Sequence, residues 1–197
     1  MLEKSPSTAL LLLDFIPAVV PAFGGSPDLL QKVQHLANEA RISGVPTIFT
    51  RTAFRPGSPE VTKSNRLIHQ VAHNYPFGEG DLSSEICPEL KPSSDDIVVT
   101  KRRVSAFFGT DLEIVLRSMH INALVLAGVC TSGVVLSTVR DAADRDYQVT
   151  VLVDGCADVH EEDHQYLMNR IIPMHATLST VDDWLTTLAS AAAQPRA

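Results

Sequence analysis

The amino-acid sequence predicts an α/β protein, a three-layer αβα Rossmann-like sandwich with a mostly parallel sheet. Short apolar runs rich in Val, Ile and Leu recur without polar alternation, which is typical of strands buried on both faces. Segments with helical spacing separate these runs, and strand–helix–strand repetition with right-handed crossovers gives a parallel sheet covered by helices. The expected strands are Ala9–Leu13, Pro46–Thr50, Ile97–Thr100, Ala123–Ala127 and Val149–Val153.

The clearest helix is predicted over Asp28–Ser43, where apolar residues recur on one face. Ser26 is expected as its N-cap, with Pro27 in the first turn and Gly44 as the stop. These signals agree with one another, so the helix should begin and end close to these residues.

A second helix is predicted to begin at Thr110, because Thr110 and Glu113 have the spacing of a capping box. Three more helices are expected from their apolar periodicity, at Ser132–Arg145, His160–Ile171 and Val181–Ala192. The segment Arg51–Asp95 is rich in Pro, Gly, Ser and His and predicts a short helix near Arg66–His73 between long loops. Loops of that length usually bind ligands or act as lids.

The composition is that of a soluble globular protein. The 197 residues are 45% hydrophobic and 20% charged, and this length predicts one domain over residues 1–197. The net charge is −7 and the basic residues are scattered, which argues against a nucleic-acid partner because phosphate binding needs clustered Lys and Arg.

Cysteine usage and the amino-terminal segment predict a cytoplasmic protein. Cys87, Cys130 and Cys156 include no CxxC pair, so neither a zinc site nor a redox centre is indicated and a reducing compartment fits best. The apolar stretch Thr8–Leu13 is too short to span a membrane and unlike a signal peptide. No membrane partner is expected.

Three features follow strand ends, where ligands bind in open parallel sheets. Asp14 ends the first predicted strand, Lys101 ends the strand that begins at Ile97, and the turn Gly128–Gly133 precedes a helix. We expect Asp14 and Lys101 to end neighbouring strands and to form an ion pair that shares acid–base work. The helix amino terminus would offer N–H groups to an oxyanion. Separately, such an Asp is often a turn former and such a Lys is often solvated.

These residues belong to motifs that resemble the isochorismatase-like hydrolases of the cysteine hydrolase superfamily. The motifs are Leu-Leu-Leu-Asp14, Thr-Lys101-Arg-Arg-Val-Ser-Ala-Phe107, Leu126-Ala-Gly-Val-Cys-Thr131 and Ser137-Thr-Val-Arg-Asp-Ala142. The resemblance implies an αβα sandwich, a homodimer or higher homo-oligomer, and a site with an Asp, a Lys and, in the amidase branches, a nucleophilic Cys. Asp14 and Lys101 match the first two. It also implies a non-proline cis peptide at Val129–Cys130.

The sequence departs from the family pattern at the nucleophile. That position lies six residues after the family glycine, Gly128, and is Val134 here. Isochorismatases proper carry glycine there and cleave a vinyl ether by protonating carbon, and Val134 is compatible with that chemistry. Ile16 replaces a glutamine that is common in the family, and Arg51 begins the segment that replaces the Asp–His zinc motif of nicotinamidase-type members. We therefore expect no metal and no cofactor.

The remaining candidates concern the pocket walls and a zinc-like motif. Phe54, Phe107 and Arg51 are the expected substrate-binding residues, although core packing is the commoner role of Phe. His160-Glu-Glu-Asp-His164 matches the HExxH pattern of zinc proteases. A third ligand is not evident downstream, so a chance match is the better interpretation.

The sequence thus predicts a hydrolase for a small, carboxylated molecule, cleaving a vinyl-ether or C–N bond without a cysteine nucleophile. Asp14 would transfer protons, Lys101 would be its electrostatic partner, and the turn with Val129, Cys130 and Val134 would supply oxyanion donors. Lys101 would lower the pKa of Asp14 whereas burial would raise it, and the sequence leaves the balance open. Two alternatives also stay open: a non-catalytic small-molecule-binding protein, and an amidase that uses Cys130 as a displaced nucleophile.

Overall fold

A six-stranded parallel sheet forms the centre of the protein. The computed structural model describes residues 7–192 and places the strands in the order β3-β2-β1-β4-β5-β6. All five strand pairings are parallel, as the repeated strand–helix pattern predicts. The strands are β1 Thr8–Leu13, β2 Thr47–Thr52, β3 Ile97–Lys101, β4 Ala123–Val129, β5 Gln148–Ala157 and β6 Thr177–Ser179.

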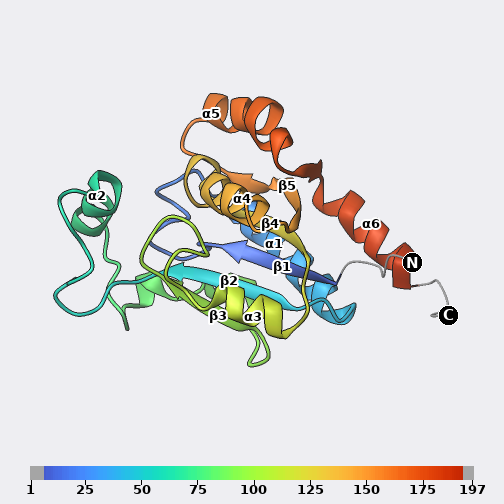
Figure 1. The fold of residues 1–197 in the computed structure, drawn as a ribbon, viewed down its shortest axis with the longest axis horizontal. Coiled ribbons are helices and arrows are strands. Elements are labelled where there is room, and N and C mark those ends of the chain that lie inside the picture. Colours follow the sequence, from blue (N-terminus) through green and yellow to red (C-terminus); the bar gives the residue numbers. More distant parts are fainter. Residues whose placement is uncertain (1–6, 193–197) are drawn as a thin grey trace.

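Helices cover both faces of this sheet (Figure 1). The α-helices are α1 Pro27–Ile42, α2 Arg66–Asn74, α3 Leu112–Ser118, α4 Leu136–Ala143, α5 Glu161–Tyr166 and α6 Val181–Ala192. Shorter helical turns are found at Leu82–Ser84, Pro88–Leu90, Thr131–Val135, Leu167–Ile171 and Ile172–Met174. Helices α1 and α6 pack on one face, whereas α3 and α4 pack on the other, in front of the sheet in Figure 1. The three-layer αβα sandwich is confirmed.

The apolar run of β1 supplies both layers of the core. Leu10 and Leu12 pack on the α1 side, and Leu11 and Leu13 pack on the α3 side. Side chains alternate between the two faces of a strand, so a strand covered on both faces needs apolar residues at every position. This explains why the run lacks polar alternation.

Helix α1 has the predicted cap, and each of its ends lies one residue before the predicted one. It begins at Pro27, and the Ser26 hydroxyl accepts a hydrogen bond from the Leu29 N–H at 3.1 Å. Gly44 follows the helix with φ +72°, a left-handed conformation that glycine adopts without a steric penalty.

The capping box predicted at Thr110 is wrong. Helix α3 begins two residues later, at Leu112. The Thr110 hydroxyl accepts a hydrogen bond from the Leu112 N–H at 3.3 Å, but it donates to the Ala106 carbonyl at 2.6 Å. Glu113 instead pairs with Arg117 one turn along the helix. The threonine hydroxyl thus ties the helix start to the preceding loop.

The long segment between β2 and β3 extends beyond the carboxyl ends of the strands. It carries α2, which lies apart from the sheet at the end toward which β1 and β2 point (Figure 1). Its predicted bounds, Arg66–His73, differ from those of α2 by one residue. The segment is therefore placed where a ligand of a parallel sheet would bind.

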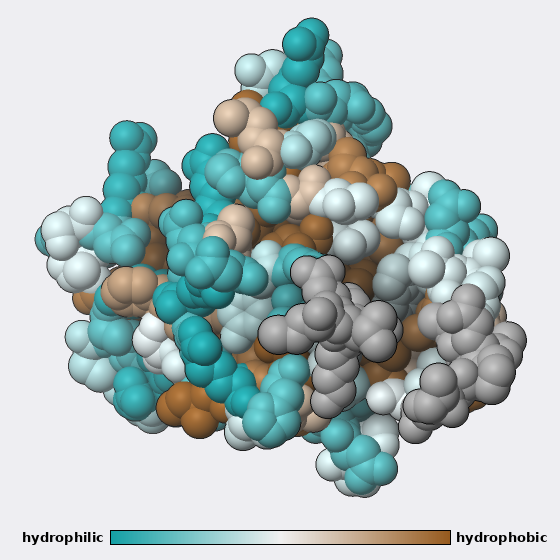
Figure 2. Space-filling model, turned by 45° about the vertical axis from the view of Figure 1, so that its right-hand side comes forward, coloured by the Kyte–Doolittle hydropathy of each residue, from teal (hydrophilic) through white to brown (hydrophobic). Residues whose placement is uncertain are grey.

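Hydrophilic residues cover much of the face seen in Figure 2, and hydrophobic residues reach this surface in separate areas. Within residues 7–192, no helix is long and apolar enough to cross a lipid bilayer.

Candidate active site

Asp14 and Lys101 lie at the carboxyl edge of the sheet but not on neighbouring strands. Asp14 directly follows β1, and Lys101 is the last residue of β3. Strand β2 lies between β1 and β3, with Leu13 paired to Thr50 and Thr52 paired to Lys101. The expectation of adjacent strands was wrong, because the order of strands in a sheet is set by the crossovers and not by residue patterns. The long lysine side chain spans the intervening strand.

The two charged groups form a buried ion pair. Lys101 Nζ lies 2.7 Å from Asp14 Oδ2. Asp14 is 5% exposed and Lys101 is 3% exposed. A buried charge is costly without a partner, so each of these residues stabilises the charged form of the other. The predicted ion pair is confirmed.

Two threonines of β2 complete the hydrogen-bond network. The Thr52 hydroxyl accepts a hydrogen bond from Lys101 Nζ at 2.8 Å and lies 3.3 Å from Asp14 Oδ2, to which it can donate. The Thr50 hydroxyl accepts from the Asp14 backbone N–H at 3.3 Å. Both threonines lie on β2, the strand between β1 and β3. Their hydroxyl groups contact Asp14, and that of Thr52 also contacts Lys101, so β2 helps to position both charged side chains.

The Lys101 ammonium uses its full donor capacity. It contacts Asp14 Oδ2 and Thr52 Oγ1, and it donates to the Arg103 carbonyl at 3.2 Å. An ammonium has three N–H donors, and three acceptors surround this one. By contrast, Asp14 Oδ1 receives only long contacts of 3.5 Å from the two threonines. Oδ1 is the oxygen that retains capacity for a further partner.

Burial raises the pKa of Asp14 above its ordinary value of 3.8, and this effect outweighs the opposing Lys101 charge. Asp14 also has φ +55°, a left-handed conformation that Asp tolerates better than most residues. A carboxyl group with a raised pKa on a rigid strand end is suited to donate a proton.

The turn after β4 has the expected form. The Val129–Cys130 peptide bond is cis, and a π-helical turn, Thr131–Val135, follows it. The Val135 N–H donates to the Cys130 carbonyl at 3.2 Å. Gly133 packs against the cysteine, because a Cβ at Gly133 would lie 2.8 Å from Cys130 Sγ. The tight turn brings Val129, Cys130 and Val134 to the same cavity as Asp14.

The surroundings of Cys130 raise the pKa of its thiol. Burial raises its pKa, and the nearby Asp158 carboxylate raises it further. Asp158 Oδ2 accepts a hydrogen bond from the Ser132 N–H at 2.5 Å. This N–H group, at the start of the turn, therefore already has an acceptor. A nucleophilic cysteine needs a lowered pKa or a base within reach, and the surroundings of Cys130 act in the opposite direction.

These residues surround a cavity of about 370 Å³, a size suited to a small organic molecule. One side is formed by the segment around α2, and the opposite side by the loop between β5 and α5. Its lining residues are Asp14, Val19, Phe23, Thr52, Leu67, Ile68, Val71, Phe77, Lys101, Arg103, Val104, Val129, Cys130, Ser132, Gly133, Val134, Asp158, Val159, His160 and Asp163.

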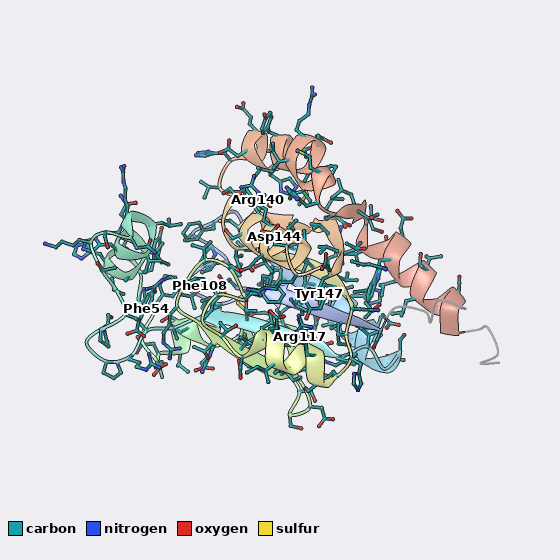
Figure 3. The ribbon with its side chains drawn as sticks, viewed as in Figure 1. Phe54, Phe108, Arg117, Arg140, Asp144 and Tyr147 are labelled. Atoms are coloured by element: carbon teal, nitrogen blue, oxygen red, sulfur yellow. The ribbon has the colours of Figure 1, made fainter. Side chains whose placement is uncertain are left out.

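The three side chains predicted to bind substrate do not line this cavity. Arg51 lies between Thr50 and Thr52 on β2, so its side chain points to the other face, where it pairs with Glu85. Phe54 lies beyond the tip of β2 on the side of α2 (Figure 3), is buried, and packs edge-on against Phe77 with 6.3 Å between ring centroids.

Phe107 belongs to the core on the α3 side of the sheet. Its ring centroid lies 5.8 Å from that of Tyr147. The turns between β3 and α3 carry this ring away from the cavity, so packing, the commoner role of Phe, accounts for it.

The two histidines of the HExxH pattern do not share a helix face. His160 precedes α5 in an extended conformation and lines the cavity. His164 is buried, and its Nδ1 lies 2.8 Å from the Thr131 hydroxyl. Over the described part of the chain, 7–192, no group of three His, Cys, Asp or Glu side chains is arranged to hold a metal ion.

Sequence reasoning missed Thr52, Thr50, Arg103 and Asp158. Thr50 and Thr52 are two residues apart and so share a face of β2, but the predicted strand ended at Thr50 and was not expected between the strands that carry Asp14 and Lys101. Arg103 appeared only within the motif that follows Lys101.

Comparison with known proteins identifies the family of this chain. The isochorismatase domain family matches residues 8–183. The chain belongs to the isochorismatase family. Ureidoacrylate amidohydrolase RutB of Pseudomonas savastanoi pv. phaseolicola is 32% identical over 210 positions, which cover 93% of this chain and 84% of that relative. Relatives of this isochorismatase-family chain are thus named as hydrolases.

Solved structures extend the similarity. An isochorismatase family protein from Burkholderia thailandensis has a TM-score of 0.83 at 28% identity, covering 94% of this chain and 97% of that one. N-carbamoylsarcosine amidase from Thermoplasma acidophilum has a TM-score of 0.69 at 27% identity, covering 89% and 97%. The isochorismatase fold and the hydrolase class therefore hold for this chain.

Proposed function

We propose that this isochorismatase-family protein hydrolyses a small, carboxylated molecule by Asp14 and Lys101 acid–base chemistry, without a cysteine nucleophile and without a cofactor. The observation that carries the proposal is the buried Asp14–Lys101 pair in the wall of a cavity that Val134 also lines. The family resemblance implies that Val134 occupies the position of the nucleophile. A valine side chain has no group that can attack a carbonyl.

The raised pKa of Asp14 favours a reaction that begins with protonation. For a vinyl ether, the Asp14 carboxyl donates its proton to the terminal carbon of the double bond, and the carbon bonded to the ether oxygen becomes positively charged. Water adds to that carbon and returns a proton to Asp14. The resulting hemiketal separates into a ketone and an alcohol.

The same groups can act on a C–N bond. In that case ionised Asp14 accepts a proton from the attacking water, N–H groups of Cys130 and Val134 stabilise the oxyanion, and the proton passes to the departing nitrogen. The name of the RutB relative supports this second bond type, since it describes an amidohydrolase of ureidoacrylate, itself a carboxylate.

The two alternatives receive less support. An amidase that uses Cys130 needs a thiolate, and the pKa of this thiol is raised. A non-catalytic binding protein has no need of a buried ion pair at the cavity wall, and such a pair is costly to bury.

The test is a hydrolysis screen against small carboxylated vinyl ethers, carbamoyl compounds and amides, with Asp14→Asn as the control. We expect a substrate that the wild type cleaves and that Asp14→Asn cleaves at least about a hundredfold more slowly, the typical minimum for loss of a general acid or base. Equal activity in the two proteins would reject the proposal.

A further inference from the structure

Besides Lys101, the cavity wall contains a second strongly basic side chain, that of Arg103. It lines the cavity together with Lys101 and is half-buried. Lys101 is paired with Asp14. Among residues 7–192, no carboxylate lies within ion-pair distance of the Arg103 guanidinium. The cavity thus presents one cation whose charge is not neutralised by a neighbouring residue.

The neighbouring arginines, unlike Arg103, have carboxylate partners. The adjacent Arg102 pairs with Glu60 and Glu79, and Arg51 pairs with Glu85. Carboxylates are therefore available in this region, and they bind the arginines that point away from the cavity. A half-buried guanidinium beside them without a counter-ion indicates a site for an external anion.

Backbone carbonyls hold the Arg103 guanidinium in place. Nη1 donates to the Arg102 carbonyl at 2.5 Å and Nη2 donates to the Glu60 carbonyl at 3.1 Å. These bonds use two of the five N–H donors of a guanidinium, which leaves three for a ligand. The Arg103 carbonyl in turn accepts from Lys101 Nζ at 3.2 Å, so the anion site is tied to the proton-transfer pair at a fixed spacing.

The other charged groups of the cavity direct an anion toward Arg103. Asp158 lies in the loop before α5 and Asp163 lies in the first turn of α5, and both line the cavity on this side, with His160 between them in sequence. Both Asp158 oxygens are already bound, to the N–H groups of Ser132 and Val159. Two carboxylates on that side repel an anion, whereas the unpaired guanidinium attracts it.

Apolar side chains form the cavity wall around α2 and the neighbouring loops. They are Phe23, Leu67, Ile68, Val71, Phe77 and Val104. A ligand that bound here would place an apolar body against these residues, and this excludes strongly polar molecules such as sugars from a close fit.

We propose that Arg103 is the specificity-determining residue of this site, and that it binds the carboxylate of a small monoanionic substrate whose apolar body packs against the α2 side. The inference rests on the proposed function for the identity of the reacting pair. Arg103 takes no part in proton transfer, and it fixes the substrate relative to Asp14.

Binding of matched fragments tests this assignment without knowledge of the natural substrate. The probes are 4-fluorobenzoate and phenylacetate, each compared with its primary amide, measured by ligand-observed NMR at concentrations up to about 10 mM. The proteins are the wild type, Arg103→Gln, Arg103→Lys, Asp14→Asn and Arg140→Gln. Arg140 is an exposed arginine of α4 that does not line the cavity (Figure 3), so its replacement removes the same charge elsewhere.

We expect the wild type to bind the carboxylates more tightly than the amides. Arg103→Gln should weaken carboxylate binding about tenfold or more, as expected for loss of a charge-assisted hydrogen bond, and should leave amide binding unchanged. Arg103→Lys should restore part of the affinity, because it keeps the charge without the planar fork. Arg140→Gln should match the wild type, and circular dichroism should show that all variants fold.

The inference is overturned if the wild type binds no carboxylate in this range, or if Arg103→Gln weakens both members of each pair equally. Its failure is separable from failure of the proposed function. If carboxylate binding depends on Arg103 but hydrolysis in the substrate screen does not depend on Asp14, only the proposed reaction is rejected. If hydrolysis depends on Asp14 but Arg103→Gln leaves KM unchanged, only the assignment of Arg103 is rejected.

Discussion

The Thr52 hydroxyl accepts a hydrogen bond from Lys101 Nζ at 2.8 Å. This bond crosses from β2 to β3, and the same hydroxyl lies within hydrogen-bond distance of Asp14 on the other side. A single uncharged residue thereby keeps both members of the ion pair in position.

Thr52→Val should destabilise the protein and slow the reaction. Valine has almost the same shape, but it leaves one N–H of a buried ammonium without an acceptor. We expect the free energy of unfolding to fall by about 1–3 kcal/mol, as measured by urea denaturation. The turnover number should also fall, because the Asp14 carboxyl loses a positioning contact.

Thr47→Val is the matched control for that change. Thr47 is buried on the same strand, and its hydroxyl has no hydrogen-bond partner. Replacing it removes an unsatisfied polar atom, so the free energy of unfolding should stay constant or rise. If Thr52→Val is no more destabilising than Thr47→Val, the Thr52 contact has no energetic importance.

The pH dependence should follow the raised pKa of Asp14. A carboxyl group whose folded-state pKa is raised contributes stability that is fully present below its ordinary value of 3.8 and is lost as the pH rises through the folded pKa. The free energy of unfolding of the wild type relative to Asp14→Asn should therefore decrease over that interval. The opposite slope would show that Lys101 outweighs burial.

The hydrolytic activity should also fall as the pH rises if Asp14 acts first as an acid. The pH profile of kcat/KM should decline as the pH rises through the pKa of the free Asp14 carboxyl. A vinyl-ether substrate should show this decline, whereas a C–N substrate that needs ionised Asp14 should show a rise. Measuring one profile thus distinguishes the two bond types.

Cys130→Ala should retain most of the hydrolytic activity. The thiol has a raised pKa and Gly133 packs against it, so its replacement removes a small packing group and not a nucleophile. Loss of a true nucleophile costs several orders of magnitude in rate. A folded Cys130→Ala protein as inactive as Asp14→Asn, or an acyl group trapped on Cys130 by mass spectrometry, would reverse this interpretation.

Activity should persist in EDTA. The residues that surround the cavity include the carboxylates Asp14, Asp158 and Asp163 and one histidine, His160. The first is paired with Lys101 and the second is bound by two N–H groups. Loss of activity on chelation followed by recovery with zinc would show that a metal ion takes part.

The sequence predicted the positions of site residues at strand ends better than the directions of other side chains. Asp14, Lys101 and the turn with Cys130 and Val134 meet as expected, because carboxyl ends of parallel strands share one edge. Arg51, Phe54 and Phe107 do not line the cavity, since their directions depend on strand alternation and on loop packing.

Three features of the structure could not be predicted from residue patterns. Strand β2 lies between the site strands, and this order is a property of the whole chain. The short strand β6 has three residues, too few for a periodicity signal. The sequence does not single out Arg103, and only the three-dimensional arrangement shows that Arg51 and Arg102 have carboxylate partners and Arg103 does not.

The thiols of this protein are poorly suited to react with oxidants. Burial raises the pKa of Cys87 and of Cys156 to about 12, and that of Cys130 is raised as well. Peroxide attacks the thiolate, and at neutral pH little thiolate is present at any of the three positions. In the proposed mechanism Val134 stands at the nucleophile position, and proton transfer depends on the carboxyl group of Asp14 and the ammonium group of Lys101. A cysteine-dependent relative is silenced when its sulfur is oxidised, whereas this enzyme would continue to turn over under oxidative stress.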